Sequence, residues 1–329
     1  MSVTFITVVF ELEVPLLRLQ AMSFERFVPA DAVAEIVVVD NTRRGLSVRE
    51  RQDLEAAYGR HRARVVTQSA IGSVPGAPGW ERQQVLKLLV SELVATDRYI
   101  ALDAKNHFVR RFDDAYFRAP DGRARIGVHG YETHPLRESL LRTVRYLGAD
   151  EQEALAQFPA TVTPFVLLTA ESRALVEEVQ RRSGRPFAAE FLAHGLTEFF
   201  LYSAWMQQLP GGRSARYADG QPGCPVVWPG DRSARAVRAA VDESDATGTP
   251  MFSVHRTALA RMDDEASDVL VRFWCRIGLL RDPAEALAFV ESFRRTFRRR
   301  LLARRAREAP YRALRRIRRH VPARVGGRA

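Results

Sequence analysis

Residues 79–113 decide the fold of this chain, and they read G-W-E-R-Q-Q-V-L-K-L-L-V-S-E-L-V-A-T-D-R-Y-I-A-L-D-A-K-N-H-F-V-R-R-F-D. Apolar residues recur at a spacing of three to four in the first half, which predicts an amphipathic helix. Residues 99–102 then form a short apolar run, as expected of a strand buried on both faces. A dense polar cluster follows this run. This order is typical of an α/β sheet that binds a ligand at the carboxyl edge of its strands.

Polar side chains of the same stretch are candidates for binding that ligand. Gln83, Gln84 and Lys87 share one face of the predicted helix, because residues three and four apart are neighbours on a helix. Four more candidates follow the predicted strand: Asp103, Lys105, Asn106 and His107. A plain turn or helix cap is the alternative, but so many polar groups together favour a ligand site.

The remaining strands support a mostly parallel sheet. Strands are predicted at residues 3–10, 35–40 and 63–67, and they alternate with predicted helices at residues 14–27 and 48–58. Asp40 and Asn41 follow the second strand, which places Asp40 at the same edge as Asp103. The alternative is that Asp40 caps the next turn. Further strands are predicted at residues 125–128, 161–168 and 251–255, the last ending in His255.

Several common classes of protein are excluded by motifs that the sequence lacks. It contains no G-x-G-x-x-G after the first strand, no G-x-x-x-x-G-K-[ST] and no G-x-S-x-G, so we expect neither a standard dinucleotide site, a P-loop nor a nucleophile elbow. The two cysteines do not make a disulfide framework, which favours a reducing cytoplasm. The sequence has no run of eighteen apolar residues, so we expect no transmembrane helix. The N-terminus lacks the pattern of a signal peptide.

Basic charge is concentrated at the C-terminal end. The chain has a net charge of +11, but residues 294–329 hold 15 Arg and one acid, so the other residues carry a net −3. Lysine occurs only at positions 87 and 105, both in the central stretch. Lys is a compact point charge and Arg a planar fork, so a tight anion site can require Lys. Chance is the alternative explanation for so small a number.

The C-terminal tail predicts a basic amphipathic helix that extends as far as Pro310. Phe289, Phe293, Phe297 and Leu301 recur at a spacing of four with Arg on their flanks. The stripe could dock on the protein core with the arginines in water, or lie on an anionic membrane surface. A nucleic-acid partner is less favoured, because the rest of the chain is net negative.

A long helix is also predicted at residues 187–209. Glu190, His194 and Glu198 would lie on one face of it, a spacing that can bind a metal, although a solvated polar row explains it better. Glu198 lies within T-E-F-F-L-Y, so its carboxylate is a candidate for a raised pKa and for a base. The alternative is a Glu paired with one of the many Arg residues.

Four segments, in this order, resemble an uncharacterised bacterial family related to the glycosyltransferases of the GT-A fold: G-W-E-R-Q-Q-V-L-K-L, Y-I-A-L-D-A-K-N-H-F, T-V-T-P-F-V and T-E-F-F-L-Y. The resemblance covers roughly residues 3–280 and excludes the Arg-rich tail. It implies one GT-A-like domain over residues 1–280, with a mixed, mostly parallel sheet flanked by helices. Residues 281–329 would form a basic C-terminal helical extension.

The resemblance also implies roles for individual residues. Asp103 matches the first Asp of the family's metal-binding D-x-D motif, but Lys105 stands at the third position and could itself neutralise a diphosphate. The expected metal is Mn²⁺ or Mg²⁺, and His255 is the candidate for a further ligand to it. Glu198 is similar to the carboxylate that activates the acceptor. Asp40 stands where related enzymes contact the base or ribose.

These observations predict a glycosyltransferase-like enzyme that moves a sugar from a nucleoside-diphosphate sugar to an acceptor hydroxyl. Charge developing on the diphosphate would be neutralised by Lys105 and Lys87, with Asn106 and His107 beside them. The alternative is a non-catalytic protein that keeps the fold and binds a nucleotide or an acidic partner. We expect a cytoplasmic location, peripheral at the inner face of the membrane if the tail binds anionic lipid.

Overall fold

Five strands form the centre of the computed structural model of this protein, in the order β3-β2-β1-β4-β9. Their bounds are β1 Val3–Val9, β2 Val33–Asp40, β3 Ala63–Thr67, β4 Arg98–Leu102 and β9 Phe165–Leu168. The first four run parallel, and β9 is antiparallel to β4. The predicted mixed, mostly parallel α/β sheet is confirmed. The structure describes every residue except 1, 73, 75, 77–78, 221–222 and 321–329, and it does not describe the side chains of 304–305 and 307–320.

The point where the strand order reverses lies between β1 and β4. From β1 the chain first builds outward through β2 and β3, and then returns to add β4 on the other side of β1. Thr7 of β1 is in register with Leu102 of β4, so the residues that follow these two strands come out at the same edge. All seven residues of β1 are buried, as a central parallel strand requires. Ligands of open α/β sheets bind at such a reversal.

Smaller sheets surround this edge. A three-stranded sheet in the order β11-β12-β5 continues from the end of β4, with β12 antiparallel to β5. Two further strand pairs are β10 with β6 and β7 with β8. The bounds are β5 Asn106–Phe108, β6 Ala124–Ile126, β7 Val128–His129, β8 Phe158–Pro159, β10 Tyr217–Asp219, β11 Val226–Val227 and β12 Met251–Val254.

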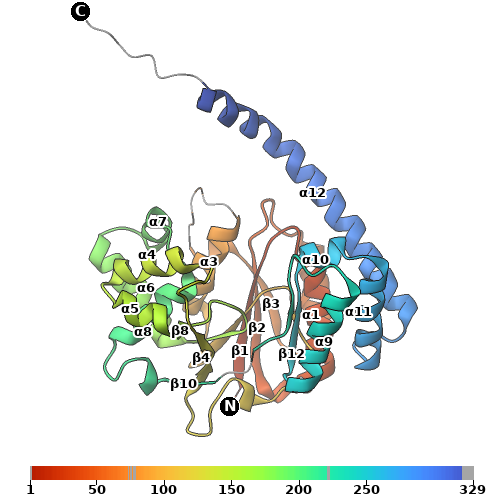
Figure 1. Ribbon diagram of the computed structural model, residues 1–329, viewed down its shortest axis with the longest axis horizontal. Coiled ribbons are helices and arrows are strands. Elements are labelled where there is room, and N and C mark those ends of the chain that lie inside the picture. The colour runs from red at the N-terminus through yellow and green to blue at the C-terminus, as the bar shows by residue number, and fades with distance from the viewer. Residues whose placement is uncertain (1, 73, 75, 77–78, 221–222, 321–329) are drawn as a thin grey trace, which may run out of the picture.

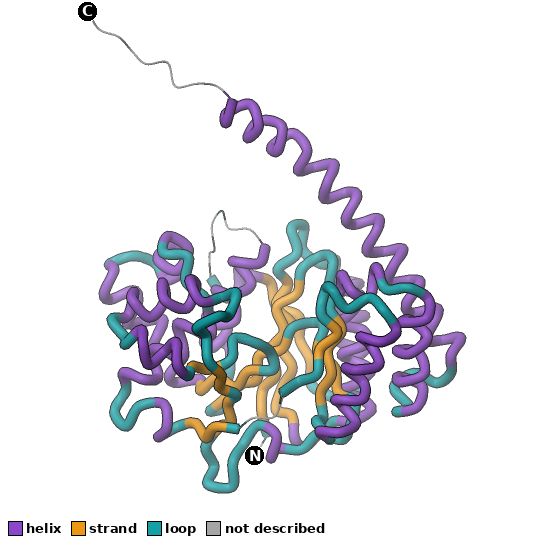
Figure 2. Tube along the Cα trace, in the orientation of Figure 1, coloured by secondary structure: helices purple, strands orange, loops and turns teal. Residues whose placement is uncertain are grey.

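Helices cover both faces of the sheet, as Figures 1 and 2 show. One group, at the left of Figure 1, comprises α3 Gly79–Leu89, α4 Arg137–Leu147, α5 Glu151–Ala156, α6 Thr169–Ser183, α7 Phe187–Ala193 and α8 Glu198–Gln208. The other group, at the right, comprises α1 Val14–Phe27, α9 Ala234–Thr247, α10 Arg256–Arg261, α11 Asp264–Arg276 and α12 Pro283–His320. A further helix, α2 Val48–Ala57, packs beside β3.

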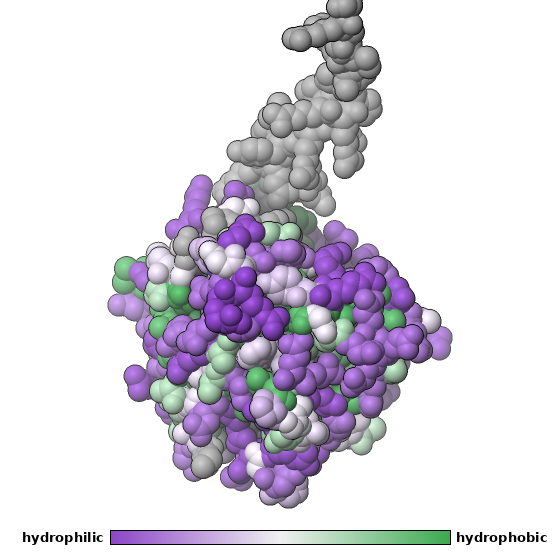
Figure 3. Space-filling model, turned by 90° about the vertical axis from the view of Figure 1, so that its left-hand side faces the viewer, coloured by the Kyte–Doolittle hydropathy of each residue, from purple (hydrophilic) through white to green (hydrophobic). Residues whose placement is uncertain are grey.

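The exposed surface of the first helical group is mostly hydrophilic. Figure 3 shows the left-hand side of Figure 1 as mostly hydrophilic, with apolar residues scattered among the polar ones. Scattered apolar residues are normal on a protein surface. Among the described residues, no helix combines the length and the apolar character needed to cross a membrane.

The prediction of one long helix at residues 187–209 is wrong. It is two helices, α7 and α8, because Gly195 between them has a positive φ of 57° that ends the first helix. Glu190, His194 and Glu198 therefore do not form a row on one helix face. Glu190 pairs with Arg185 and His194, whereas Glu198 begins α8 and faces another part of the structure.

The last helix is longer than predicted and half of it belongs to the body. It continues past Pro310 to His320, although Pro310 has no N–H to donate to the helix. Phe293 and Phe297 are buried and stack on each other. The guanidinium of Arg294 donates to the carbonyl of Met262 and the hydroxyl of Ser267.

The aromatic stripe of this tail is therefore docked on the core. The first half of α12 packs against α10 and α11, although the predicted extension begins at residue 281. The C-terminal part of α12 projects away from the body (Figure 1), and Leu302 is 64% exposed. Residues 321–329 of the extension lie outside the described part of the chain.

Candidate functional site

Asp103 lies between the two lysines of the chain at the carboxyl edge of β4. Its Oδ1 is 2.9 Å from Nζ of Lys87, and its Oδ2 is 2.7 Å from Nζ of Lys105. Lys87 comes from α3 and Lys105 from the turn after β4, so helix and sheet meet at this carboxylate. Gln83, one turn before Lys87 on α3, adds a contact of 3.4 Å to Oδ1. Both oxygens of Asp103 are thus occupied by cations.

The ion pair continues inward to Glu198. Nζ of Lys87 is 3.3 Å from Oε1 of Glu198, and both side chains are almost fully buried. The amide oxygen of Gln84 accepts the backbone N–H of Glu198 at 3.4 Å, which ties the start of α8 to α3. Acid and base therefore alternate across the site, in the order Glu198, Lys87, Asp103 and Lys105.

Burial and pairing act in opposite directions on these groups. Burial by itself would raise the pKa of Asp103, but Lys105 and Lys87 outweigh it and hold that pKa well below its usual range. Burial would likewise lower the pKa of Lys87, but Asp103 and Glu198 outweigh it and raise that pKa. For Glu198 burial dominates, so its pKa is raised even though Lys87 lies beside it. Lys87 and Asp103 are therefore charged at neutral pH.

The buried side-chain amides of Gln20 and Asn106 fix the turn that carries Asp103 and Lys105. Nε2 of Gln20 donates to the carbonyls of Asp103 and Asn106, each at 3.0 Å. The side-chain oxygen of Asn106 accepts the N–H of Asp103 at 2.7 Å, and its nitrogen donates to the hydroxyl of Ser253 at 2.6 Å. Both polar atoms of the Asn106 side chain therefore have partners inside the fold and hold the turn.

His107 is also part of the core. The indole N–H of Trp274 donates to its Nε2 at 3.1 Å, and its Nδ1 is 3.3 Å from the carbonyl of Lys105. Burial lowers the pKa of His107 to about 4, so the ring is neutral at physiological pH. The predicted ligand contact of His107 is replaced by a structural role, because both ring nitrogens are engaged inside the fold.

At the end of β2, Asp40 adopts the alternative role that the sequence left open. It accepts the N–H of Thr42 at 2.9 Å and that of Leu46 at 2.5 Å, so its carboxylate caps the following turn. Asn41 donates to the carbonyl of Gly79 at 3.0 Å and so joins this turn to the start of α3. Both residues are at the predicted edge, but Asp40 is engaged by the backbone.

The donor set does not fit a divalent metal ion. The two oxygens of Asp103 face ammonium groups, and Nδ1 of His255 accepts the N–H of Thr257 as the cap of α10. The pKa of His255 is lowered to about 4 by burial and by the cations of Arg256 and Lys105. Within the described residues, no group of three or more His, Cys, Asp or Glu is placed to hold a metal. The predicted metal site at Asp103 and His255 is therefore not supported.

Three residues of this edge were missed by the sequence analysis. Glu13, just before α1, is buried and bonded to Nη1 of Arg256 from α10. Trp228 follows β11, is 49% exposed, and has its ring 6.0 Å from Nζ of Lys105. These residues are far apart in the sequence and no motif joins them. The one signal in the sequence that could have identified Glu13 is an acidic residue shortly after a strand, because Glu13 stands four residues after the end of β1.

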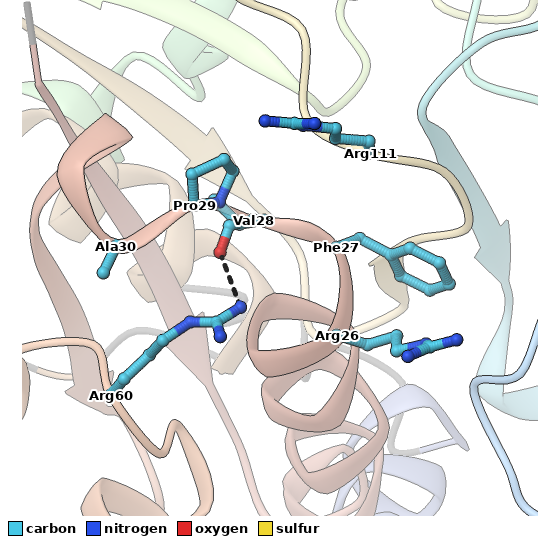
Figure 4. A pocket seen from close by; sticks show the side chains of 7 residues that line it. All are labelled: Arg26, Phe27, Val28, Pro29, Ala30, Arg60 and Arg111. Atoms are coloured by element: carbon cyan, nitrogen blue, oxygen red, sulfur yellow. Dashed lines mark hydrogen bonds between the residues drawn. The ribbon is translucent and has the colours of Figure 1, made fainter.

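A surface pocket of about 760 Å³ lies elsewhere, at the amino ends of the strands (Figure 4). Its lining is Arg26, Phe27, Val28, Pro29, Ala30, Arg60 and Arg111. The guanidinium of Arg60 already donates to the carbonyls of Glu25 and Val28. Because ligands of open α/β sheets bind at the carboxyl ends of strands, we assign the candidate site to the Asp103 edge and not to this pocket.

The chain belongs to a protein family described as "Family of unknown function (DUF6492)", whose model matches residues 13–218. The match includes Glu13, both lysines, Asp103 and Glu198, whereas Trp228, His255 and Arg256 lie beyond it. Among curated proteins, none matches the chain.

Two of the solved structures that resemble this one in part are glycosyltransferases. The galactosyltransferase LgtC, solved with donor and acceptor sugar analogs, is 12% identical, with 60% of this chain and 71% of LgtC covered and a TM-score of 0.36. The bifunctional glycosyltransferase WbbM, solved without ligand, is 11% identical, with 77% of this chain and 45% of WbbM covered and a TM-score of 0.42. At these TM-scores the similarity carries no weight for activity.

Replacing Lys87 is expected to destabilise the fold strongly. Lys87→Met leaves Asp103 and Glu198 as buried carboxylates without their shared cation, which costs about 3–5 kcal/mol of unfolding free energy at pH 7. In the wild type, the lowered pKa of Asp103 gives stability that is present above the unfolded pKa of about 3.9 and is lost as pH falls through the folded value. In the variant, Asp103 keeps Lys105 but Glu198 has no cation left, so protonation of Glu198 relieves part of the cost and the penalty shrinks as pH falls toward 4.

Urea unfolding from pH 4 to pH 8 measures this penalty. The control is the double variant Lys87→Met with Glu198→Leu. It removes the buried carboxylate of Glu198 and should recover part of the lost unfolding free energy. An equal penalty at pH 4 and pH 8 would show that lost packing, and not charge, is the cause.

Proposed function

We propose that this protein is a glycosyltransferase that moves a sugar from a nucleoside-diphosphate sugar to an acceptor hydroxyl. The observation that carries the proposal is the position of Lys105. Its ammonium lies at the carboxyl edge where the strand order reverses, and it is held at 2.7 Å by Asp103. The resemblance of the surrounding segments to glycosyltransferases of the GT-A fold supports it.

Lys105 is proposed to bind the diphosphate. In the reaction, the acceptor oxygen forms a bond to C1 of the sugar while the bond from C1 to the diphosphate oxygen breaks. The electron pair stays on the diphosphate, so the site must stabilise that developing charge. Lys105 can supply a positive charge there, and Asp103 holds the ammonium in place. The ammonium of Lys87 is shared by the carboxylates of Asp103 and Glu198, so we propose that it positions Asp103.

Glu198 is proposed as the base that takes the proton of the acceptor hydroxyl. Its burial raises the carboxyl pKa, which makes it a stronger base than an exposed Glu. Lys87, at 3.3 Å, stabilises the ionised form that must be present before the reaction. No step of this mechanism passes through a metal ion, because the donor set of the site does not fit one.

The second candidate function is nucleotide binding without transfer. The position of the second Asp of the D-x-D motif is taken by Lys105, and this favours the second function. A lysine that binds the diphosphate is sufficient for a protein that only binds the nucleotide. Turnover of a bound nucleotide sugar separates this function from the enzyme.

Lys105→Ala is expected to abolish binding of nucleoside diphosphates while the protein stays folded. Lys105→Arg should restore it only in part, because the planar fork of Arg does not reproduce a point charge. Isothermal titration calorimetry with UDP and GDP, with and without Mn²⁺, measures this for the wild type and both variants.

Arg111→Ala in the pocket at the amino ends of the strands is the matched control, and it should bind like the wild type. If the wild type binds neither nucleotide in either condition, the proposed function is wrong. If Arg111→Ala loses binding and Lys105→Ala keeps it, the anion site lies in the other pocket.

Glu198→Gln is expected to leave nucleotide-sugar affinity nearly unchanged and to lower turnover by about 10²–10⁴-fold, the usual contribution of a general base. Release of nucleoside diphosphate from a panel of nucleotide sugars, with water as acceptor, gives the rate. Unchanged turnover in a folded variant would leave Glu198 with a structural role only.

We also propose that the projecting part of α12, residues 302–320, binds an anionic membrane surface. This segment contains eight Arg and one acid, with apolar residues at 302, 306, 314 and 317. A helix with this pattern can lie at a lipid interface. Arg300, just before the segment, donates to the carbonyl of Glu11 after β1, so the segment leaves the body on the side of the candidate site.

A chain that ends at Leu301 is expected to stay folded and to lose binding to anionic vesicles. The cut is placed there because Phe297 is buried in the core, whereas Leu302 is exposed. Binding of the intact protein should weaken with salt, because charges are screened within about 8 Å at physiological ionic strength. Co-sedimentation with anionic and with neutral vesicles measures it. Equal binding by the shortened chain would exclude the segment as the membrane contact.

A further inference from the structure

Glu13 is a buried acid that the mechanism above does not use. It lies at the end of the loop that joins β1 to α1, and β1 is the strand next to β4 at the reversal of strand order. Its backbone is fixed, because its N–H donates to the carbonyl of Phe10 at 2.9 Å and its carbonyl accepts the N–H of Leu16 at 2.8 Å. The carboxylate is therefore held at the same edge as Asp103.

One oxygen of this carboxylate has a partner and the other has none. Oε1 is bonded to the guanidinium of Arg256, which is itself held over the ring of Phe10 at 4.8 Å. Oε2 of Glu13 is buried and has no hydrogen-bond partner among the described residues. Buried polar atoms are nearly always paired, so an unpaired carboxylate oxygen marks a place where a donor belongs.

A neutral donor fits this oxygen better than a cation. Glu13 and Asp103 are already balanced by Arg256 and Lys105, so an added cation would leave an uncompensated charge. The pKa of Glu13 is raised, first by burial and also by the charge of Asp103, while Arg256 and Lys105 oppose the rise. The charges of Asp103 and Lys105 are thus near enough to act on Glu13. A hydroxyl supplies a hydrogen bond without adding charge.

We propose that Oε2 of Glu13 accepts a hydrogen bond from a sugar hydroxyl of the ligand, which makes Glu13 a binding residue of this site. The inference rests on the proposed function, since a nucleotide sugar carries hydroxyls on both sides of its diphosphate. They belong to the ribose on one side and to the transferred sugar on the other. Arg256 positions the carboxylate by holding Oε1, and Oε2 is left for the ligand.

The experiment compares ligands with and without each hydroxyl. Calorimetry is done with UDP, 2′-deoxy-UDP, 3′-deoxy-UDP and UDP-glucose, or with the guanosine series if GDP binds better. We expect the wild type to lose about 10- to 100-fold in affinity when the hydroxyl that meets Glu13 is removed, the usual worth of a hydrogen bond to a charged group. Glu13→Ala should bind both forms equally, at the affinity of the deoxy form.

The matched control is Glu11→Ala, two residues earlier in the same loop. Glu11 is only partly buried and accepts the N–H of Arg43, so its loss should leave the preference for the hydroxyl intact. Glu13→Gln provides a second variant of nearly the same size, and it should lower the preference without unfolding the protein. Thermal melting of each variant confirms that it is folded.

The outcomes separate this inference from the proposed function. If Glu13→Ala removes the preference for a ribose hydroxyl, the ribose is the partner. If it instead removes an added affinity of the nucleotide sugar over UDP, the partner is the transferred sugar. A wild type that binds nucleotide with preferences independent of Glu13 would overturn the inference alone, and a buried water would then fill the place. A wild type that binds no nucleotide would overturn both.

Discussion

The position of one carboxylate between two ammonium groups is the constraint on which the site depends. Asp103 faces Lys87 on one side and Lys105 on the other, at distances of 2.9 Å and 2.7 Å. A buried charge is costly unless it is paired and hydrogen-bonded, so helix α3, the end of β4 and the start of α8 must come together for any of these groups to be tolerated. The pairs thus tie α3 and α8 to the end of β4 in the central sheet.

Charge balance explains why this edge departs from a metal site. A divalent ion needs oxygen ligands with free lone pairs, but Asp103 meets an ammonium group on each of its oxygens and His255 caps α10. Lys105 supplies a positive charge at this edge from the protein itself. The nearby Glu13 and Arg256 form a second compensated pair, so the edge is neutral while Lys105 and Arg256 remain partly exposed. Such an edge suits an anion that also carries hydroxyls.

Tertiary packing changed the role of several residues that the sequence had placed at the site. Asn106 and His107 stand next to Lys105 in the chain, but they belong to β5, and all three residues of that strand are buried. Both turn inward to Ser253 and Trp274 and fix the turn. Asp40 is satisfied by the backbone of its own turn. The aromatic stripe of α12 is likewise half buried on the core, which a single amphipathic pattern could not distinguish from a membrane-binding face.

Local patterns in the sequence were enough to predict the parallel sheet, the order of its strands along the chain and the polar cluster after β4. Hydrophobic periodicity and strand-end residues are properties of short segments, so they can be recognised without contacts. The break between α7 and α8 at Gly195 and the pairing of Lys87 with both Asp103 and Glu198 appeared only in three dimensions. Glu13 and Arg256 are separated by more than two hundred residues, and only folding brings such groups within bonding distance. Burial and charge pairing depend on those distant neighbours, and they decide which polar residues hold the fold and which remain free for a ligand.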